Sequence, residues 1–334
     1  MLKRTINHAA IELTIEPIDP LLIKSGQATV SGTDMAFVQT YRFGADPEPF
    51  IPGSSLKGVI RSYAEKICRS LRQDPVPVCL PYVEPGKERN GEQKQASCGL
   101  RIEQINKNKK DIRISATEAY RLSCPACRTF GSHGFIGRLA TSDAYLTESF
   151  KKNNKCLLEL RDGVAIDRLT GGPVGKAKYD LEVLTKGEFL SHIDIHNFER
   201  WQLGLVGLVL RDLEEGLIRI GLGKSRGLGR IRGKVTRFTV TYFGKPQEKL
   251  VGLAAACSEA ECKAYGLFGE AEPGQALPEH TQDGLRYSYD LTSEWRNALE
   301  SGVQDLIAYL DKVTWPTEFD AYSSGGKDDV SVRR

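Results

Sequence analysis

The sequence has few features of a membrane or secreted protein. No run of about 18 apolar residues occurs in the 334 residues, so no membrane-spanning helix is expected. The N-terminal segment carries basic side chains but no continuous apolar stretch, so it is not a secretory signal. We therefore expect a cytoplasmic protein that does not contact membranes. Disulfides are rare in the cytoplasm, so the eight cysteines need another explanation.

Several common nucleotide-binding and catalytic motifs are also missing. Residues 223–225 read Gly-Lys-Ser, but a P-loop needs glycine where Ile218 stands. A dinucleotide-binding fingerprint needs glycine where Arg226 stands. His192 and His196 are four residues apart but lack the glutamate of a metalloprotease motif. The sequence therefore indicates neither a P-loop NTPase, nor a dinucleotide-dependent enzyme, nor a helical zinc protease.

Charge is divided unevenly along the chain, although the net charge is only +3. Residues 1–250 hold 39 basic and 28 acidic residues, whereas residues 251–334 hold 7 basic and 15 acidic residues. Uneven surface charge without a function is one interpretation. The other is a polyanionic partner for the first part and a different partner for the rest.

Hydrophobic periodicity predicts a mixture of strands and helices. Helical spacing favours amphipathic helices over 55–72, 197–212 and 291–310. Strand-like patterns occur at 10–16, 156–166, 181–184, 189–195 and 237–242. This order predicts an α+β fold with a modified ferredoxin-like core and long insertions. Residues 73–123 read as an irregular, proline-rich insertion, residues 170–178 as a basic loop, and the end from Ser323 as disordered.

Four cysteines in the insertion predict a zinc site. Cys124 and Cys127 form a CxxC pair, in which a short turn points two thiolates at one ion. Cys79 and Cys98 lie upstream and supply two further thiolates. A redox-active CxxC is one alternative, although no thioredoxin-like pattern surrounds it. Buried cysteines without a metal are the other alternative.

A glycine-rich segment carries basic side chains between a helix and a strand. Residues 221–229 read GLGKSRGLG, with Lys224 and Arg226 between the glycines. Glycines let a backbone approach a phosphate chain closely, and basic side chains neutralise it. The segment could also be a plain turn. A similar basic bias at Lys57, Arg61 and residues 176–178 favours contact with an RNA backbone.

Five segments in order resemble the RAMP (repeat-associated mysterious protein) superfamily, and in particular the backbone subunits of type III CRISPR effector complexes. They are IPGSSLKGVIR (51–61), CPACRTFGS (124–132), GRLATSDAYL (137–146), VAIDRLTGGPVGKAKYDLEVL (164–184) and GLGKSRGLGRI (221–231). The similarity covers roughly residues 8–245 and leaves the C-terminal segment outside.

The resemblance implies a modified RNA-recognition fold that binds a CRISPR RNA, pairs it with target RNA and assembles with other effector subunits in antiviral defence. The start of the helix at 55–72 would face the guide phosphates, as helix N-termini favour anions. Residues 164–184 would form a thumb hairpin, and the glycine-rich segment would line the guide channel. The residues assigned to RNA contact are Ser54, Ser55, Lys57, Arg61, Arg168, Lys176, Lys178, Gly223, Lys224, Ser225, Arg226 and Gly227.

The resemblance also implies a catalytic carboxylate upstream of the IPGSSLKG motif. Cleaving members of the family use an aspartate there, and Asp34 lies in that region. Such a carboxylate could bind Mg²⁺ or another divalent cation, or help to activate a ribose 2′-hydroxyl for endoribonuclease cleavage. Asp46 is the competing residue, but Asp46-Pro47 is typical of a turn. A structural role for Asp34, capping a loop, is the other interpretation.

Two features depart from the simplest backbone subunits. The cysteines resemble the zinc-bearing versions of type III-D and single-chain effectors. The acidic C-terminal part has no counterpart in the resemblance. We expect an RNA-binding domain over 1–247, with the zinc insertion at 73–130, and a mostly helical extension over 248–334 that docks on a neighbouring subunit.

Two alternatives remain within the same superfamily. The chain could be a structural or capping subunit that does not cleave RNA. It could also be a guide-processing endoribonuclease, a class that uses a histidine near the N-terminus, for which His8 is the candidate.

Overall fold

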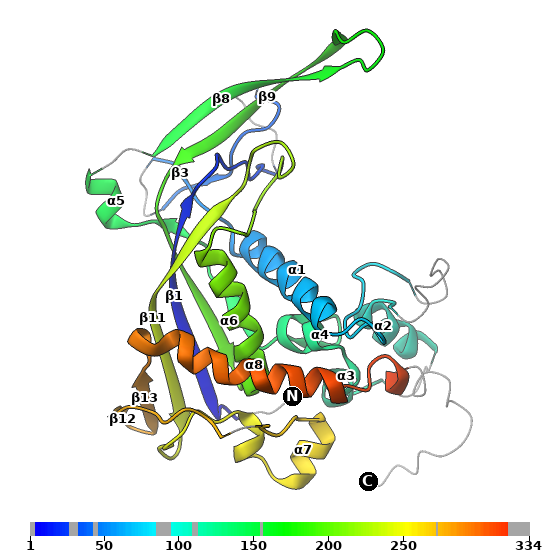
Figure 1. Ribbon diagram of the computed structural model, residues 1–334, viewed down its shortest axis with the longest axis vertical. Coiled ribbons are helices and arrows are strands. Elements are labelled where there is room, and N and C mark those ends of the chain that lie inside the picture. The colour runs from blue at the N-terminus through cyan, green and yellow to red at the C-terminus, as the bar shows by residue number, and fades with distance from the viewer. Residues whose placement is uncertain are drawn as a thin grey trace.

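The computed structural model describes residues 4–26, 33–42, 46–84, 95–108, 113–153, 156–271 and 273–319. Its main feature is a seven-stranded antiparallel sheet with helices packed on one face (Figure 1). The strand order is β12-β13-β11-β1-β10-β6, and β7 also pairs with β10. This is a mixed α/β structure with antiparallel sheets, consistent with the predicted α+β class.

The strands of the main sheet come from widely separated parts of the chain. The first three in sequence order are β1 (Asn7–Pro17), β6 (Leu139–Thr141) and β7 (Tyr145–Leu146). The other four are β10 (Phe189–His196), β11 (Ile231–Phe243), β12 (His280–Asp283) and β13 (Arg286–Asp290). Two pairs of two-residue strands lie outside it: β2 (Gln39–Thr40) with β3 (Glu48–Pro49), and β4 (Gly131–Ser132) with β5 (Phe135–Ile136).

The alternation predicted for the first strand is confirmed in β1. Ala9, Ile11, Leu13 and Ile15 are at most 1% exposed and belong to the main core, whereas the residues between them are half-buried. Since side chains alternate between the faces of a strand, the buried face contacts the helices and His8 and Glu12 lie on the opposite face.

Two predicted helices cover the buried face of the sheet. α1 (Gly53–Leu71) buries Leu56, Ile60 and Ala64, as its helical spacing predicts. α6 (Arg200–Glu214) begins a little later than predicted, because Glu199 caps it with a capping box. Both helices lie against the sheet beside each other in Figure 1.

The prediction of an irregular insertion is wrong for much of its length. α2 (Cys98–Asn108), α3 (Ala116–Leu122) and α4 (Pro125–Phe130) lie within or just after it. Ser115 and Glu118 form a capping box at α3, a signal that the sequence contains. Their apolar residues, such as Ile102 and Tyr120, join the main core. Pro75 and Pro77 follow the end of α1, but burial against the core stabilises helices in the remainder of the insertion.

A long hairpin projects beyond the sheet (Figure 1). Its strands are β8 (Leu157–Ile166) and β9 (Pro173–Lys186), preceded by the short α5 (Glu148–Asn153). The prediction of a loop over 170–178 is wrong for its second half, because Pro173 pairs with Ile166 and Lys178 with Val164. The turn itself is short, with Asp167 accepting a hydrogen bond from the Leu169 N–H at 2.7 Å.

The C-terminal part is built into the same sheet. The predicted third helix is confirmed as α8 (Trp295–Lys312), which follows a 3₁₀ turn at Thr292–Glu294. The hairpin β12–β13, which the periodicity did not indicate, extends the sheet by pairing with β11. A 3₁₀ turn at Leu253–Ala256 and α7 (Glu259–Tyr265) connect the two parts. The expected disorder from Ser323 lies outside the described residues, and the domain boundary at 247 stays a prediction.

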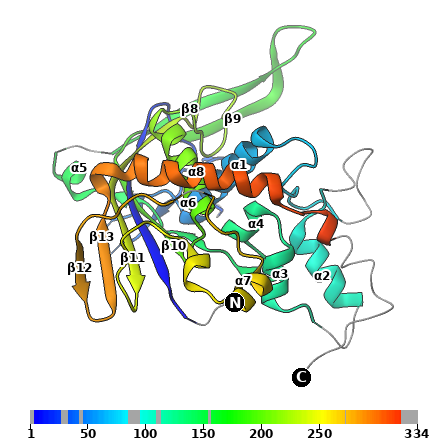
Figure 2. The same cartoon turned by 60° about the horizontal axis from the view of Figure 1, so that its bottom comes forward.

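α8 crosses α6 at very close range (Figure 2). A Cβ atom added to Gly204 would lie 2.1 Å from the backbone of Gly302, so only glycine permits this crossing. Arg200 and Asp305 form a buried ion pair across it, with Nε–Oδ2 at 2.6 Å. Within the described residues, none of the helices is both long and apolar enough to cross a membrane.

Candidate functional site

A groove of about 520 Å³ lies between α1 and the segment that leads into the glycine-rich turn. Three of the residues predicted to contact RNA line it: Ser54, Ser55 and Lys224. They are far apart in sequence, so the fold brings them together. The groove also contains Lys66 and Arg219, which gives one wall and one end basic side chains.

Two of these basic residues were not predicted from the sequence. Ser62 and Lys66 continue the polar stripe of α1 that begins at Ser55. Ser62 follows Ser55 by seven residues, and Lys66 follows Ser62 by four. That spacing is a signal that could have found them. No motif indicates Arg219, whose guanidinium donates to the carbonyl of Lys224 beside the groove.

The start of α1 is only partly free for an anion. Pro52 is the N-cap residue and supplies no side-chain hydrogen bond. The Gly53 N–H, however, donates to Asp143 Oδ1 at 2.7 Å, so a carboxylate already occupies this position. The sequence did not predict this role for Asp143. A phosphate would therefore meet the following N–H groups, at Ser54 and Ser55.

The glycine-rich turn needs its glycines for conformation. Gly221, Gly223, Gly227 and Gly229 all have φ between +70° and +91°. A Cβ atom on Gly221 would lie 2.2 Å from the Leu22 carbonyl oxygen. The glycines therefore have the conformational role that a plain turn would give them. Between the glycines, Lys224, Ser225 and Arg226 are exposed. The turn thus presents two basic side chains to solvent.

Burial and charge act on the lysines of this region. Burial, and then the nearby Lys66, lower the pKa of Lys224. Burial, and then Arg61, lower the pKa of Lys57. Lys57 and Arg61 do not line the groove but lie on another face of α1. Cations held close together in this way would bind an anion more strongly than isolated ones.

The middle of the β8–β9 hairpin contacts both Asp34 and the glycine-rich turn. Asp34 is exposed, and its Oδ2 accepts a hydrogen bond from the Asp180 N–H at 3.2 Å. The next residue back, Tyr179, accepts a hydrogen bond through its hydroxyl from Arg226 Nη1 at 2.7 Å. The competing Asp46 is exposed and lies just before β3. Asp34 thus has one contact that is typical of a loop-capping residue.

The remaining basic residues predicted for RNA contact lie on the hairpin. Lys178 Nζ lies 3.2 Å from Asp162 Oδ2 across the two strands. Arg168 is exposed in the turn at the tip. Lys176 lies on β9, and its side chain is outside the described part of the structure.

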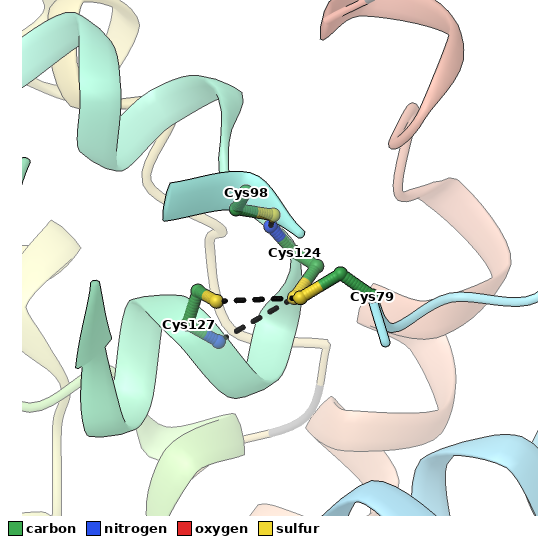
Figure 3. Close-up of side chains that lie close together, drawn as sticks. All are labelled: Cys79, Cys98, Cys124 and Cys127. Carbon is green, nitrogen blue, oxygen red and sulfur yellow. Dashed lines mark hydrogen bonds between the residues drawn. The ribbon is translucent and has the colours of Figure 1, made fainter. Parts of the chain in front are cut away.

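The four cysteines predicted to bind zinc form one buried cluster (Figure 3). Their sulfur atoms all lie within 4.8 Å of one another. Cys79 Sγ is 3.6 Å from Cys127 Sγ and 3.7 Å from Cys124 Sγ. Tetrahedral zinc with Zn–S bonds of about 2.3 Å places its sulfurs about 3.8 Å apart, so the cluster is compatible with structural zinc. None of the four forms a disulfide.

The local structure explains how the cysteines converge. Cys124 is the N-cap of α4 and Cys127 lies in its first turn, so the short helix directs both sulfurs to one side. Cys98 begins α2, and its sulfur accepts the Cys124 N–H at 3.4 Å. Cys79 lies in the segment after α1. Hydrogen bonds from the other three thiols, that of Cys124 first, lower the pKa of Cys79 well below its ordinary value.

Arg61 contacts this cluster. Its Nη2 donates to Cys127 Sγ at 3.3 Å, and its Nη1 donates to the Gly131 carbonyl at 3.0 Å. Burial by itself would lower the pKa of Arg61, but Cys127 and then Glu65 outweigh it and raise the pKa. The side chain that the sequence predicts at an RNA phosphate therefore lies against a cysteine sulfur.

Two histidines, His8 and His196, lie together on the open face of the sheet, opposite the helices. His8 Nε2 lies 2.8 Å from Asp194 Oδ1, and its ring stacks on His196 with centroids 4.5 Å apart. The hydrogen bond from His8 lowers the pKa of Asp194, and burial followed by His8 lowers that of His196. His8 thus lies away from the groove formed by α1 and the glycine-rich turn.

Comparison with known proteins agrees with the resemblance read from the motifs. No curated protein matches the chain. The model of the RAMP superfamily matches residues 14–232, which is more than half of the chain and includes both the groove and the cysteine cluster. The chain therefore belongs to the RAMP superfamily.

Proposed function

We propose that the chain is a guide-RNA-binding backbone subunit of a type III CRISPR effector complex. Membership in the superfamily suggests a CRISPR-associated RNA-binding subunit. The observation that carries the narrower proposal is the groove, where Ser54, Ser55 and Lys224 from two distant motifs converge beside Lys66. Guide RNA held by its backbone needs such a row of donors and cations.

The strand order supports a ferredoxin-like core. The four central strands run β11-β1-β10-β6, with α1 between β1 and β6 and α6 between β10 and β11. This is the order of a split βαβ arrangement. The projecting β8–β9 hairpin is the proposed thumb, since it carries exposed Ile166 and Leu169 at and near its tip. Such apolar side chains could separate bases of a guide–target duplex.

RNA binding is tested with purified full-length protein and a labelled single-stranded RNA. We expect binding without sequence preference and with an affinity that falls steeply as salt is raised. Affinity that depended on the sequence of the RNA would contradict backbone recognition. Absence of binding at low salt would overturn the proposal.

Cleavage of target RNA at Asp34 is the catalytic part of the proposal. The exposed carboxylate accepts the Asp180 N–H in the middle of the hairpin, next to Tyr179, whose hydroxyl contacts Arg226 of the glycine-rich turn. There it could accept a proton from the 2′-hydroxyl of a kinked ribose. Among the described residues, the four cysteines are the one group of three or more ligand side chains placed for a single ion. The described residues therefore offer no prepared site for the expected Mg²⁺ beside Asp34, and we derive no step through it.

The matching experiment uses Asp34→Ala in the assembled complex with guide and target RNA. We expect unchanged guide binding and loss of one of the regularly spaced target cuts. Asp46→Ala is the control and should cut normally. Unchanged cutting by Asp34→Ala would favour the second candidate function, a structural subunit. The hydrogen bond from the Asp180 N–H to Asp34 supports this candidate, because it gives Asp34 a structural role.

The remaining parts of the proposal concern class and partners. The cysteine cluster supports zinc and, with it, a type III-D-like subunit. Residues 1–247 would bind RNA in the cytoplasm. The acidic part after 248 lies outside the family match and would contact a neighbouring subunit.

A further inference from the structure

Helix α1 is fastened to the cysteine cluster at two points. Arg61 donates to Cys127 Sγ, as described above. Two turns later, Arg69 Nη2 donates to the carbonyl oxygen of Cys79 at 3.1 Å. α1 thus contacts both the sulfur of one cysteine and the backbone of another. The two cysteines come from segments on either side of α2.

Glu65 joins the two arginines into a row along the helix. Its Oε1 accepts from Arg61 Nε at 3.0 Å, and its Oε2 lies 3.8 Å from Arg69 Nη2. The Glu65 side chain is only 7% exposed, and burial, offset in part by Arg61, raises its pKa. Buried ionised groups persist only when they are paired, so the row has a structural reason to stay in place.

The charge of the row matches that of a loaded cluster. Four thiolates and one divalent ion together carry a charge of −2, which is costly to bury without nearby cations. The two arginines and Glu65 together supply +1 at the edge of the cluster. A bound ion also fixes the position of the Cys127 sulfur, which is the acceptor of the Arg61 hydrogen bond. Occupancy of the cluster therefore changes how strongly α1 is held.

The same helix forms a wall of the proposed RNA groove. Ser55, Ser62 and Lys66 line the groove, whereas Arg61 and Arg69 face the cluster. A helix moves nearly as a rigid rod, so a shift at the cluster displaces the groove wall. A separate cavity of about 280 Å³, lined by Arg61 and Cys127, borders the cluster and offers a path to solvent.

We infer that a divalent ion in the cysteine cluster holds α1, through Arg61, in the position that completes the RNA groove. Arg61 is then a positioning residue that acts through the metal site, and not a phosphate contact. This regulation rests on the proposed RNA-binding function, whereas the contact of Arg61 with the loaded cluster can be tested without RNA.

The first measurement is the zinc affinity of the full chain, from competition with a colorimetric chelator. Removing a partner outside the metal's own ligands commonly costs about 10–100-fold in affinity, and we expect this for Arg61→Ala. Arg61→Lys keeps the charge and should recover part of the loss. Arg211→Ala removes an exposed arginine on α6 and is the matched control. Wild-type zinc affinity in Arg61→Ala would overturn the inference.

The second measurement is affinity for a labelled single-stranded RNA. We expect about a tenfold loss when the wild-type protein is stripped of zinc, and a similar loss for zinc-saturated Arg61→Ala with an unchanged salt slope. A direct phosphate contact would instead lower the salt slope by about 0.7 and leave zinc affinity unchanged. That result, or equal RNA affinity with and without zinc, would refute the coupling.

A third measurement separates this inference from the proposed function. If zinc-loaded wild-type protein binds no RNA, the proposed function fails. Hydrogen exchange of the α1 amides then decides the coupling. Faster exchange over residues 54–62 after zinc removal, and in zinc-saturated Arg61→Ala, supports it. Unchanged protection contradicts it. Arg61→Lys provides a folded variant if Arg61→Ala unfolds.

Discussion

Two faces of α1 use similar basic residues in different surroundings. On one face, Lys66 and the serines line an open groove that is accessible to water and to a bound anion. On the other face, Arg61 and Arg69 are about three quarters buried and contact Glu65 and the cysteine cluster. A basic residue next to a family motif is therefore not by itself an RNA contact. The neighbours on its face of the helix decide its role.

The largest expected effect comes from breaking the cluster side. Cys124→Ser removes a sulfur that contacts the Cys79 sulfur and accepts the Cys127 N–H, so zinc binding and the packing of α2, α3 and α4 should be lost together. We expect a loss of more than about 4 kcal/mol in the free energy of unfolding, measured by chemical denaturation. Cys257→Ser is the control, since Cys257 lies outside the cluster, and it should bind zinc normally. Retained zinc in Cys124→Ser would refute the metal site.

A smaller effect is expected at the groove end of the same helix. A Cβ atom on Gly53 would lie 2.8 Å from the backbone of Ser142, so Gly53→Ala should destabilise by about 1–3 kcal/mol. It should also weaken RNA binding, because the helix start must move. Gly58→Ala is the matched control, with open space at its Cβ, and should stabilise by about 0.5–1 kcal/mol. Thermal unfolding of both variants tests the pair, and equal stability would contradict the close approach.

The smallest effect concerns single charges in the groove. Lys224→Ala should weaken RNA binding equally for all sequences and reduce the salt slope by about 0.7, with no change in zinc affinity. Lys245→Ala, an exposed lysine outside the groove, is the control. Because burial and Lys66 lower the pKa of Lys224, its charge is lost at lower pH than that of an ordinary lysine. RNA affinity should therefore decline earlier in the alkaline range for the wild type than for Lys224→Ala, and parallel pH profiles would contradict this role.

Local patterns accounted for the elements with strong periodicity. β1 and α1 follow from alternation and from a 3.6-residue spacing, because each buries one face against a core. The helices of the insertion were missed, since short segments such as α3 gain most of their stability from tertiary burial of Tyr120 and its neighbours. The β12–β13 hairpin was missed for a related reason: its residues are mostly exposed and show little alternation.

The candidate site was predictable in its composition but not in its grouping. The motifs indicated the serines, the glycine-rich turn and the four cysteines, because each residue type has a chemistry that its spacing suggests. Asp143 reaches the site through its contact with Gly53, which is distant in sequence, and no local pattern indicates this. Arg219 contacts the nearby carbonyl of Lys224, but no motif assigns it to the groove.

The sequence by itself determined the family, the amphipathic start of α1 and the set of thiols that can hold an ion. Only the tertiary structure decided that Lys66 faces the groove and Arg61 faces the cluster. The two residues are five positions apart, or about 140° around a helix, so they point to different neighbours. Which neighbour lies on which side depends on packing between segments that are distant in the chain, and helical periodicity contains no information about that packing.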